Sequence, residues 1–139
     1  MSDENKHKHL ELVQGVVDRM AANSFQVKGW STAVVSALLA LSLSKDDQVF
    51  ANLALFPLLA FWALDGYYLA LEKGFRGLYD RVRKLPESEI DYSMERTKGE
   101  QGLSRWLSAA FSFPNLFFHV SALVVAIVVS IYVYRPCNL

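Results

Sequence analysis

The side chain best placed for chemistry is an acid inside an otherwise apolar segment. Asp65 is the one charged residue between positions 48 and 71, and Lys28 adjoins the uncharged run 29–44. A carboxylate within a bilayer is costly unless it is paired or hydrated. Asp65 therefore has two interpretations: a structural ion pair with Lys28, or a member of a polar ring at the mouth of a pore.

Lys28 and Asp65 also lie at matching depths. Asp65 is 16 residues inward from Val49, and Lys28 is 16 residues inward from Ser44. At about 1.5 Å per helical residue, each lies roughly 24 Å from the same end of two adjacent antiparallel helices. This spacing predicts that the two side chains meet, and it leaves both interpretations open.

Other ionisable residues have fewer partners. His119 lies in an apolar segment whose polar neighbours are Ser121 and Ser130, so we expect a hydrogen-bonded structural histidine rather than a proton relay. His7 and His9 supply two ligands on a terminal segment, too few for a metal site. No catalytic triad, phosphate-cradling glycine loop or carboxylate pair is placed for catalysis. We therefore expect no enzyme activity, no cofactor and no metal.

The polar stretch 86–105 holds a candidate ligand-binding group. Arg96 and Lys98 are cations suited to phosphates, Tyr92 is an aromatic ring suited to stacking on a base, and Asp91 lies beside them. The alternative interpretation is an ordinary solvated linker.

These residues require elements that can hold them in a membrane. The chain has 139 residues, of which 53% are hydrophobic and 20% charged. Segments 29–44 and 106–134 carry no charge, and segment 48–71 carries one. A bilayer-spanning helix needs roughly 20 mostly apolar residues. We therefore expect three transmembrane helices, at 29–44, 48–71 and 114–134, in a single membrane domain covering residues 1–139.

The overall composition argues against several other classes of protein. The 14 basic residues are matched by 14 acidic ones, which argues against an electrostatic footprint for duplex DNA. The single cysteine, Cys137, cannot form a disulfide framework or a thiolate zinc cage. The first apolar run lies behind a charged segment and no cleavage motif follows it, so we expect no cleaved signal peptide.

Helical periodicity continues beyond the expected spans. Apolar residues recur at three and four from Leu10 to Met20, which predicts an amphipathic helix at 7–28 that runs into the first span. The polar run 45–47 is expected to form a tight turn. The second helix should extend over 72–85 and stop at Pro86, before a loop at 86–105 with one short helical turn. The predicted fold is all-α, with three transmembrane helices and a cytoplasmic helical-hairpin extension.

The distribution of Lys and Arg predicts the orientation. Twelve of these residues lie in the N-terminal segment and in 72–105, against two, Lys45 and Arg135, on the opposite side. Because cytoplasmic segments carry the excess of Lys and Arg, we expect the N-terminus and the loop 86–105 inside the cell and the C-terminus outside.

Small residues recur along the first two helices. One set repeats every seven residues and one every four in the first helix, and a third follows the second helix. Because small side chains let membrane helices approach closely, we expect a tightly packed hairpin. The second set also has another interpretation, in which it lines a hydrated path between copies of the chain. The three sets are Gly15, Ala22, Gly29 and Ser36; Thr32, Ser36, Ala40 and Ser44; and Ala63, Gly66, Ala70, Gly74 and Gly77.

Three runs of the sequence form a recognisable pattern. They are RMAANSFQVKGW (19–30), FWALDGYYLALEKGFRGLYDRVR (61–83) and EIDYSM (89–94), followed by the third span. Together they resemble the SLATT-type transmembrane proteins of bacteria, which are found beside nucleotide-synthesising enzymes in anti-phage defence. SLATT-type proteins usually have two spans, and this chain has three.

The resemblance implies an oligomeric, pore-forming effector of the bacterial inner membrane, with the C-terminus in the periplasm. On the hairpin, Arg19 and Glu72 lie nearly level and are placed to pair, while Asn23 and Ser24 are placed to hydrogen-bond across helices. The positions that match the family's pattern are Asn23, Ser24, Lys28, Gly29, Trp30, Asp65, Glu72, Arg76 and Tyr79.

The expected function is therefore a homo-oligomeric pore or channel of about four chains, gated through its cytoplasmic part. The expected partners are the lipid bilayer, further copies of the chain, and a nucleotide-synthesising enzyme or its oligonucleotide or cyclic nucleotide product. The alternative is a non-conducting membrane scaffold that anchors a cytoplasmic partner.

Overall fold

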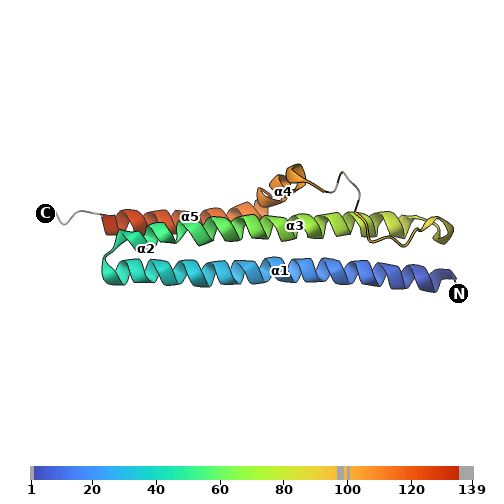
Figure 1. Ribbon diagram of the computed structural model, residues 1–139, viewed down its shortest axis with the longest axis horizontal. Helices are drawn as coiled ribbons and strands as arrows, with labels where there is room; N and C mark the ends of the chain where they lie inside the picture. The colour runs from blue at the N-terminus through green and yellow to red at the C-terminus, as the bar shows by residue number, and fades with distance from the viewer. Residues whose placement is uncertain (1, 97–98, 100, 135–139) are drawn as a thin grey trace.

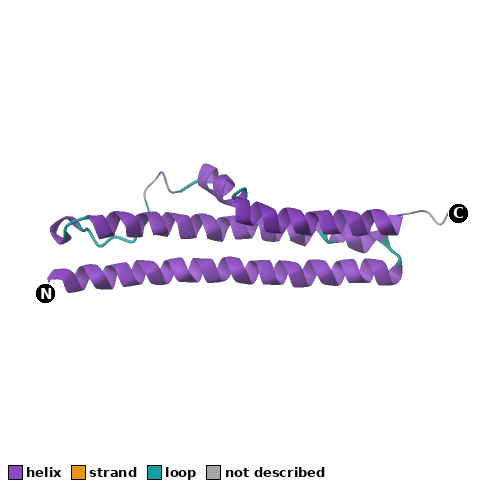
Figure 2. Cartoon of the chain, turned by 180° about the vertical axis from the view of Figure 1, so that it is seen from behind, coloured by secondary structure: helices purple, strands orange, loops and turns teal. Residues whose placement is uncertain are grey.

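Figure 1 shows the computed structural model of the chain, which describes residues 2–96, 99 and 101–134. The described residues are mostly helical, with no strand among them, as the all-α prediction requires. Three elements form an elongated bundle, and shorter ones join them (Figures 1 and 2). The elements are α1 (Ser2–Lys45), α2 (Gln48–Leu53), α3 (Leu55–Lys84), a 3-10 turn η1 (Glu87–Glu89), α4 (Leu103–Ala110) and α5 (Phe113–Tyr134).

Three stretches of the described chain are long and apolar enough to cross a membrane: Glu4–Lys45, Gln48–Lys84 and Phe113–Tyr134. The 22 residues of α5 span about 33 Å, close to the ~30 Å of a hydrocarbon core. The 44 residues of α1 span about 66 Å. Helix α5 lies beside one half of the α1–α3 pair, so the other half continues as two helices (Figure 1).

The turn between α1 and α2 follows from its polar residues. Asp46 has a positive φ of 51°, a conformation that Asp tolerates better than most residues. Asp47 caps α2, because its side chain accepts a hydrogen bond from the backbone N–H of Val49 at 2.9 Å. Ser42 donates to the Asp47 carbonyl at 2.8 Å. The predicted tight turn at 45–47 is present.

The second span is interrupted, whereas one continuous helix was expected over residues 48–71. Helix α2 ends at Leu53 and α3 begins at Leu55. The reason is Pro57, which has no N–H to donate and whose ring clashes with the carbonyl four residues earlier, that of Leu53. Ala54 bridges the interruption, with its N–H bonded to Phe50 and its carbonyl accepting from Leu58.

Two apolar clusters hold the bundle. Near the α1–α2 turn, Val35 and Leu39 of α1 pack with Leu58 of α3 and Ala126 of α5. At the opposite end, Val13 of α1 packs with residues near the end of α3. There Lys6 donates to the carbonyls of Arg83 and Leu85, at 3.2 and 2.8 Å, and so satisfies the C-terminus of α3.

Helix α4 was not predicted: the expected loop 86–105 and the residues after it contain η1 and then an eight-residue helix. Two tryptophan N–H groups tie α4 to α3. Trp62 donates to the carbonyl of Ala110 at 2.9 Å, and Trp106 donates to that of Ala63 at 3.0 Å. These long-range bonds hold α4 against α3.

The small residues of α1 do not make the close packing that was expected of them. Gly15, Ala22, Gly29 and Ser36 are all exposed, and a Cβ added at Gly15 or Gly29 would meet nothing within 4 Å. Helix α1 instead buries a neighbouring face. On α3, a Cβ at Gly66 would lie 2.8 Å from Cβ of Ala110, so this glycine allows the approach of α4 rather than α1.

Candidate functional site

The most constrained polar site is centred on Asp65, whose side chain is fully buried between three helices. Ser24 of α1 donates to Oδ1, while Lys28 of α1 and His119 of α5 approach Oδ2. The distances to Asp65 are 2.5 Å for Ser24 Oγ, 2.5 Å for Lys28 Nζ and 3.0 Å for His119 Nε2. We call these four residues the Asp65 cluster.

Helical spacing explains why α1 supplies two members of the cluster. Ser24 and Lys28 are four residues apart and so lie on the same face, one turn from each other. Lys28 Nζ also donates to Ser24 Oγ at 3.0 Å. One turn of α1 therefore presents a hydroxyl and a cation to the carboxylate. The structure brings Lys28 and Asp65 together, the contact that their matching depths predict.

His119 is the member whose partner the sequence analysis missed. It is fully buried, and the ring of Trp62 stacks on it at 5.7 Å with an interplanar angle of 7°. Phe118 meets it edge-on at 5.0 Å. A proton on Nε2 lets His119 donate to Asp65 as a neutral ring. Its Nδ1 is buried and has no hydrogen-bond partner among the described residues.

The charges of the cluster compensate each other. The carboxylate of Asp65 faces one ammonium group and accepts a hydrogen bond from Ser24, and His119 donates to it in the tautomer that carries the proton on Nε2. Lys28 also lies 5.9 Å from the ring of Phe118, and its side chain keeps 25% of its surface exposed. Through these contacts the buried carboxylate of α3 joins α1 and α5, and the loss of a partner would leave a buried charge uncompensated.

The described residues contain no group of three His, Cys, Asp or Glu side chains that could hold a metal. No protein-family model, no curated protein and no solved structure matches this chain. The resemblance to SLATT-type proteins therefore stays a prediction. What can be argued about function has to come from the chain's own geometry.

The expected contact between Arg19 and Glu72 is not formed. Glu72 instead accepts a hydrogen bond from Arg76 one turn along α3, at 2.8 Å, and Arg19 is exposed. The i, i+4 spacing within one helix favours this nearer partner. Ser24 makes the expected bond across helices, whereas Asn23 is half-buried and makes no such bond among the described residues.

The structure brings together two residues of the candidate ligand-binding loop, because Asp91 and Arg96 line one hollow of about 440 Å³, whereas Tyr92 does not line it. Tyr92, which has a positive φ of 55°, places its ring edge-on to His9 at 5.6 Å and donates to Glu87 at 3.2 Å. Partial desolvation, followed by the charge and hydrogen bond of Glu87, raises the pKa of Tyr92 above its ordinary value of 10.0. Arg96 lies over the ring of Phe75 at 5.5 Å.

The remaining members of that loop act locally or lie outside the described residues. The Asp91 side chain accepts a hydrogen bond from the backbone N–H of Ser93 at 3.0 Å. Lys98 lies outside the described residues. The geometry therefore favours a loop that packs back on the hairpin over one that stacks a base on Tyr92.

The hydroxyl stripe of α1 faces away from the chain's own core. Thr32, Ser36, Ala40 and Ser44 are all exposed, so packing on the second span does not use them. Thr32 donates to the carbonyl of Lys28 at 2.9 Å. Between α1 and α5 lies a hollow of about 270 Å³ whose wall includes Thr32, Ser36 and Ser121.

Proposed function

We propose that the chain is a homo-oligomeric, channel-like membrane effector in which α1 faces neighbouring copies. The observation that carries this proposal is the outward position of Thr32, Ser36, Ala40 and Ser44. Small and hydroxyl side chains gain little from contact with lipid, whereas they let a second helix approach closely. The open space around Gly29 extends this accessible face by one turn.

The hollow between α1 and α5 supports a hydrated path along the same face. Its hydroxyls come from two helices and its volume of about 270 Å³ is large enough for several water molecules. The rest of its wall is apolar, with Val35, Leu39 and Phe118, which suits a path that wets only when it widens. Lys28 and the Asp65 cluster lie one turn from its Thr32 end. Three spans are too few to enclose a water path, so a pore needs several copies, which we propose to be about four in cyclic symmetry.

In this proposal the two-helix end of the bundle lies in the cytoplasm and gates the pore. The excess of Lys and Arg at that end supports this orientation. A reporter active only outside the cytoplasm should be active after Leu139 and silent after Leu85. The reverse pattern would overturn the orientation. The bacterial inner membrane, a role in anti-phage defence and a nucleotide activator are further parts of the proposal, and they rest on the resemblance alone.

Ion flux through the purified protein in liposomes is the decisive test. We expect flux from the natural chain, and its loss in Ser36→Leu with the oligomer intact, because a larger apolar side chain favours drying of a narrow path. Ser36→Thr keeps the hydroxyl and is the matched control, for which we expect flux close to that of the natural chain. Full flux from Ser36→Leu in an intact oligomer would show that this face does not line the path.

Cross-linking tests the contact between copies separately. In a Cys137→Ser background, Gly29→Cys should form disulfide-linked dimers in membranes, since this position has open space around it. Leu41→Cys is the control, because Leu41 is also exposed but lies on a different side of α1. Equal cross-linking at both positions would contradict a specific contact. An intact oligomer that gives no flux at all would favour the scaffold function instead.

A further inference from the structure

We infer that the pocket between α3 and α4 binds the phosphate of an anionic phospholipid headgroup. The pocket has a volume of about 320 Å³, and three cations line it: Lys73 and Arg76 from α3 and Arg105 from α4. This assignment does not depend on whether the chain conducts ions. It concerns a different part of the molecule from the Asp65 cluster and from the hydroxyl stripe.

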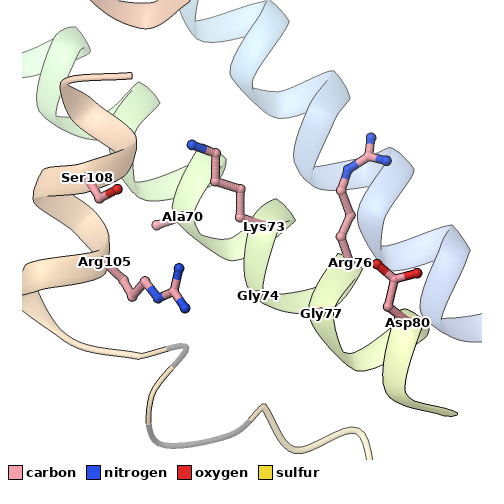
Figure 3. Close-up of a pocket in the computed structure, with 8 residues that line it drawn as sticks. All are labelled: Ala70, Lys73, Gly74, Arg76, Gly77, Asp80, Arg105 and Ser108. Carbon is pink, nitrogen blue, oxygen red and sulfur yellow. The ribbon is translucent and has the colours of Figure 1, made fainter. Parts of the chain in front are cut away.

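Glycines give the pocket its depth. Gly74 and Gly77 lie one turn apart on the wall formed by α3 and leave backbone where side chains would otherwise fill the space. Figure 3 shows the guanidinium of Arg105 reaching from α4 toward this glycine face, with Lys73 on the adjoining turn of α3. In the same view (Figure 3), the Lys73 ammonium extends toward Ala70, away from Gly74 and Gly77. The pocket therefore has cations from two helices beside a wall that lacks side chains at the glycines, an arrangement that suits a compact anion such as a phosphate.

Two of the three cations of the pocket have no acidic partner among the described residues. Its one acid, Asp80, pairs with Arg83 at 3.0 Å, and Arg76 pairs with Glu72 at 2.8 Å. Among the described residues, no carboxylate pairs with Lys73 or Arg105. Arg105 donates through Nε to the carbonyl of Gly99 at 2.9 Å, which orients its guanidinium. Lys73 and Arg105 are therefore available to bind an anion in the pocket.

The depth of the pocket favours a lipid as the source of the phosphate. Helix α5 has a length that matches the hydrocarbon core, and α4 precedes its first residue, Phe113. Lys73 lies 25 residues beyond Gln48, about 38 Å along the helix path, and so just past a ~30 Å core. Both walls of the pocket therefore lie at the level of the headgroups.

Helix α4 also has the character of an interfacial helix. It leaves the bundle axis at an angle (Figure 1), and Leu103, Leu107 and the following Phe111 are exposed. Short helices with exposed apolar residues and a basic side lie at the boundary between headgroups and acyl chains. An apolar hollow lined by Tyr67, Leu71 and Trp106 shares Arg105 with the phosphate pocket and provides room for the glycerol and upper acyl chains.

Native mass spectrometry of the full chain in detergent tests the assignment, with phosphatidylglycerol and phosphatidylcholine added in equal amounts. We expect preferential retention of phosphatidylglycerol. Lys73→Gln and Arg105→Gln should each weaken that preference about fivefold, because a basic residue near an anionic headgroup has an effect of that order. Lys8→Gln and Lys84→Gln are the matched controls, since both lysines are exposed and neither lines the pocket.

Several outcomes would overturn the assignment. Equal retention of the two lipids would show that the pocket does not recognise the anionic headgroup, and equal losses in the control variants would show an unspecific charge effect. Displacement of phosphatidylglycerol by inorganic phosphate or by ADP would assign the pocket to a soluble phosphate compound instead. Lys73→Gln alters an exposed side chain, so its thermal unfolding in lipid-free detergent should match that of the natural chain.

Discussion

Helix α3 carries two kinds of ion pair, and they differ in almost every physical respect. Asp65 is fully buried and meets donors from two other helices. About two to five turns farther along, Glu72 and Asp80 pair with arginines of the same helix, Arg76 and Arg83. The two arginines keep 59% and 55% of their side-chain surfaces exposed.

The difference shows how location decides what a charge does for a fold. An exposed pair at i, i+3 or i, i+4 competes with water and adds a few tenths of a kcal/mol to its own helix. A buried charge gains nothing from water, so each missing partner costs several times more. The Asp65 cluster therefore determines which helices meet, whereas the outer pairs merely adjust the stability of a helix that forms without them.

The largest effect is expected from removing the buried carboxylate. Asp65→Ala leaves Lys28 without a counter-charge and removes the acceptor of Ser24 and His119, so unfolding in detergent should become easier by about 3–5 kcal/mol. Circular dichroism during denaturant titration measures the change. Asp80→Ala is the matched control on the same helix and should cost about 0.5 kcal/mol or less. Similar losses for the two variants would remove the distinction between the buried and exposed pairs.

The coupling between Lys28 and Asp65 should be the next largest effect. In a double-mutant cycle with Lys28→Ala and Asp65→Ala, the two changes together should cost about 2 kcal/mol less than the sum of the single changes. The reason is that each single change leaves a charge unpaired, and the double change leaves none. Additive free energies of unfolding would contradict the pair and would leave the pore-mouth interpretation of Asp65 standing.

Helix α4 approaches α3 closely at Gly66, the residue next to Asp65, and a substitution there tests this contact. Gly66→Ala places a Cβ 2.8 Å from Cβ and 3.0 Å from Cα of Ala110, so the backbone of α4 has to shift. We expect a loss of about 1–2 kcal/mol in detergent unfolding, in the range for overpacking. Gly15→Ala is the control, with open space and a gain of up to about 1 kcal/mol in helix propensity. An unchanged free energy of unfolding in Gly66→Ala would show that α4 does not pack tightly against α3 at this position.

Much of the fold follows from the sequence because its signals are local. Uncharged apolar runs, the polar turn at 45–47 and the stop at Pro86 each depend on a few adjacent residues, and the structure has all three. The break at Ala54 was equally local, since Pro57 is visible in the sequence. The signal for helix α4 is not local, because hydrogen bonds between residues far apart in the sequence, from Trp62 of α3 and Trp106 of α4, stabilise it.

The site divides in the same way. Matching depths on adjacent helices predict the approach of Lys28 to Asp65. His119 lies 15 residues, about 22 Å, from Tyr134, nearly the depth of Asp65. Counting residues from the outer end of each span therefore also predicts that His119 and Asp65 meet. The outward face of α1 could not be predicted, because small residues allow close approach without specifying which neighbour approaches.

The smallest expected effect is the coupling within the exposed pair of Glu72 and Arg76. Their contact is as short as many buried ones, at 2.8 Å, but Arg76 keeps 59% of its side-chain surface exposed against 14% for Glu72, so water competes mainly for the arginine. A double-mutant cycle with Glu72→Gln and Arg76→Gln should give a coupling of about 0.3–0.5 kcal/mol, and added salt should reduce it. The Lys28–Asp65 coupling should change little with salt, because Asp65 is fully buried. If the Glu72–Arg76 coupling equals that of the buried pair and resists salt, the outer half of α3 is also shielded from water, which a contact with another chain would explain.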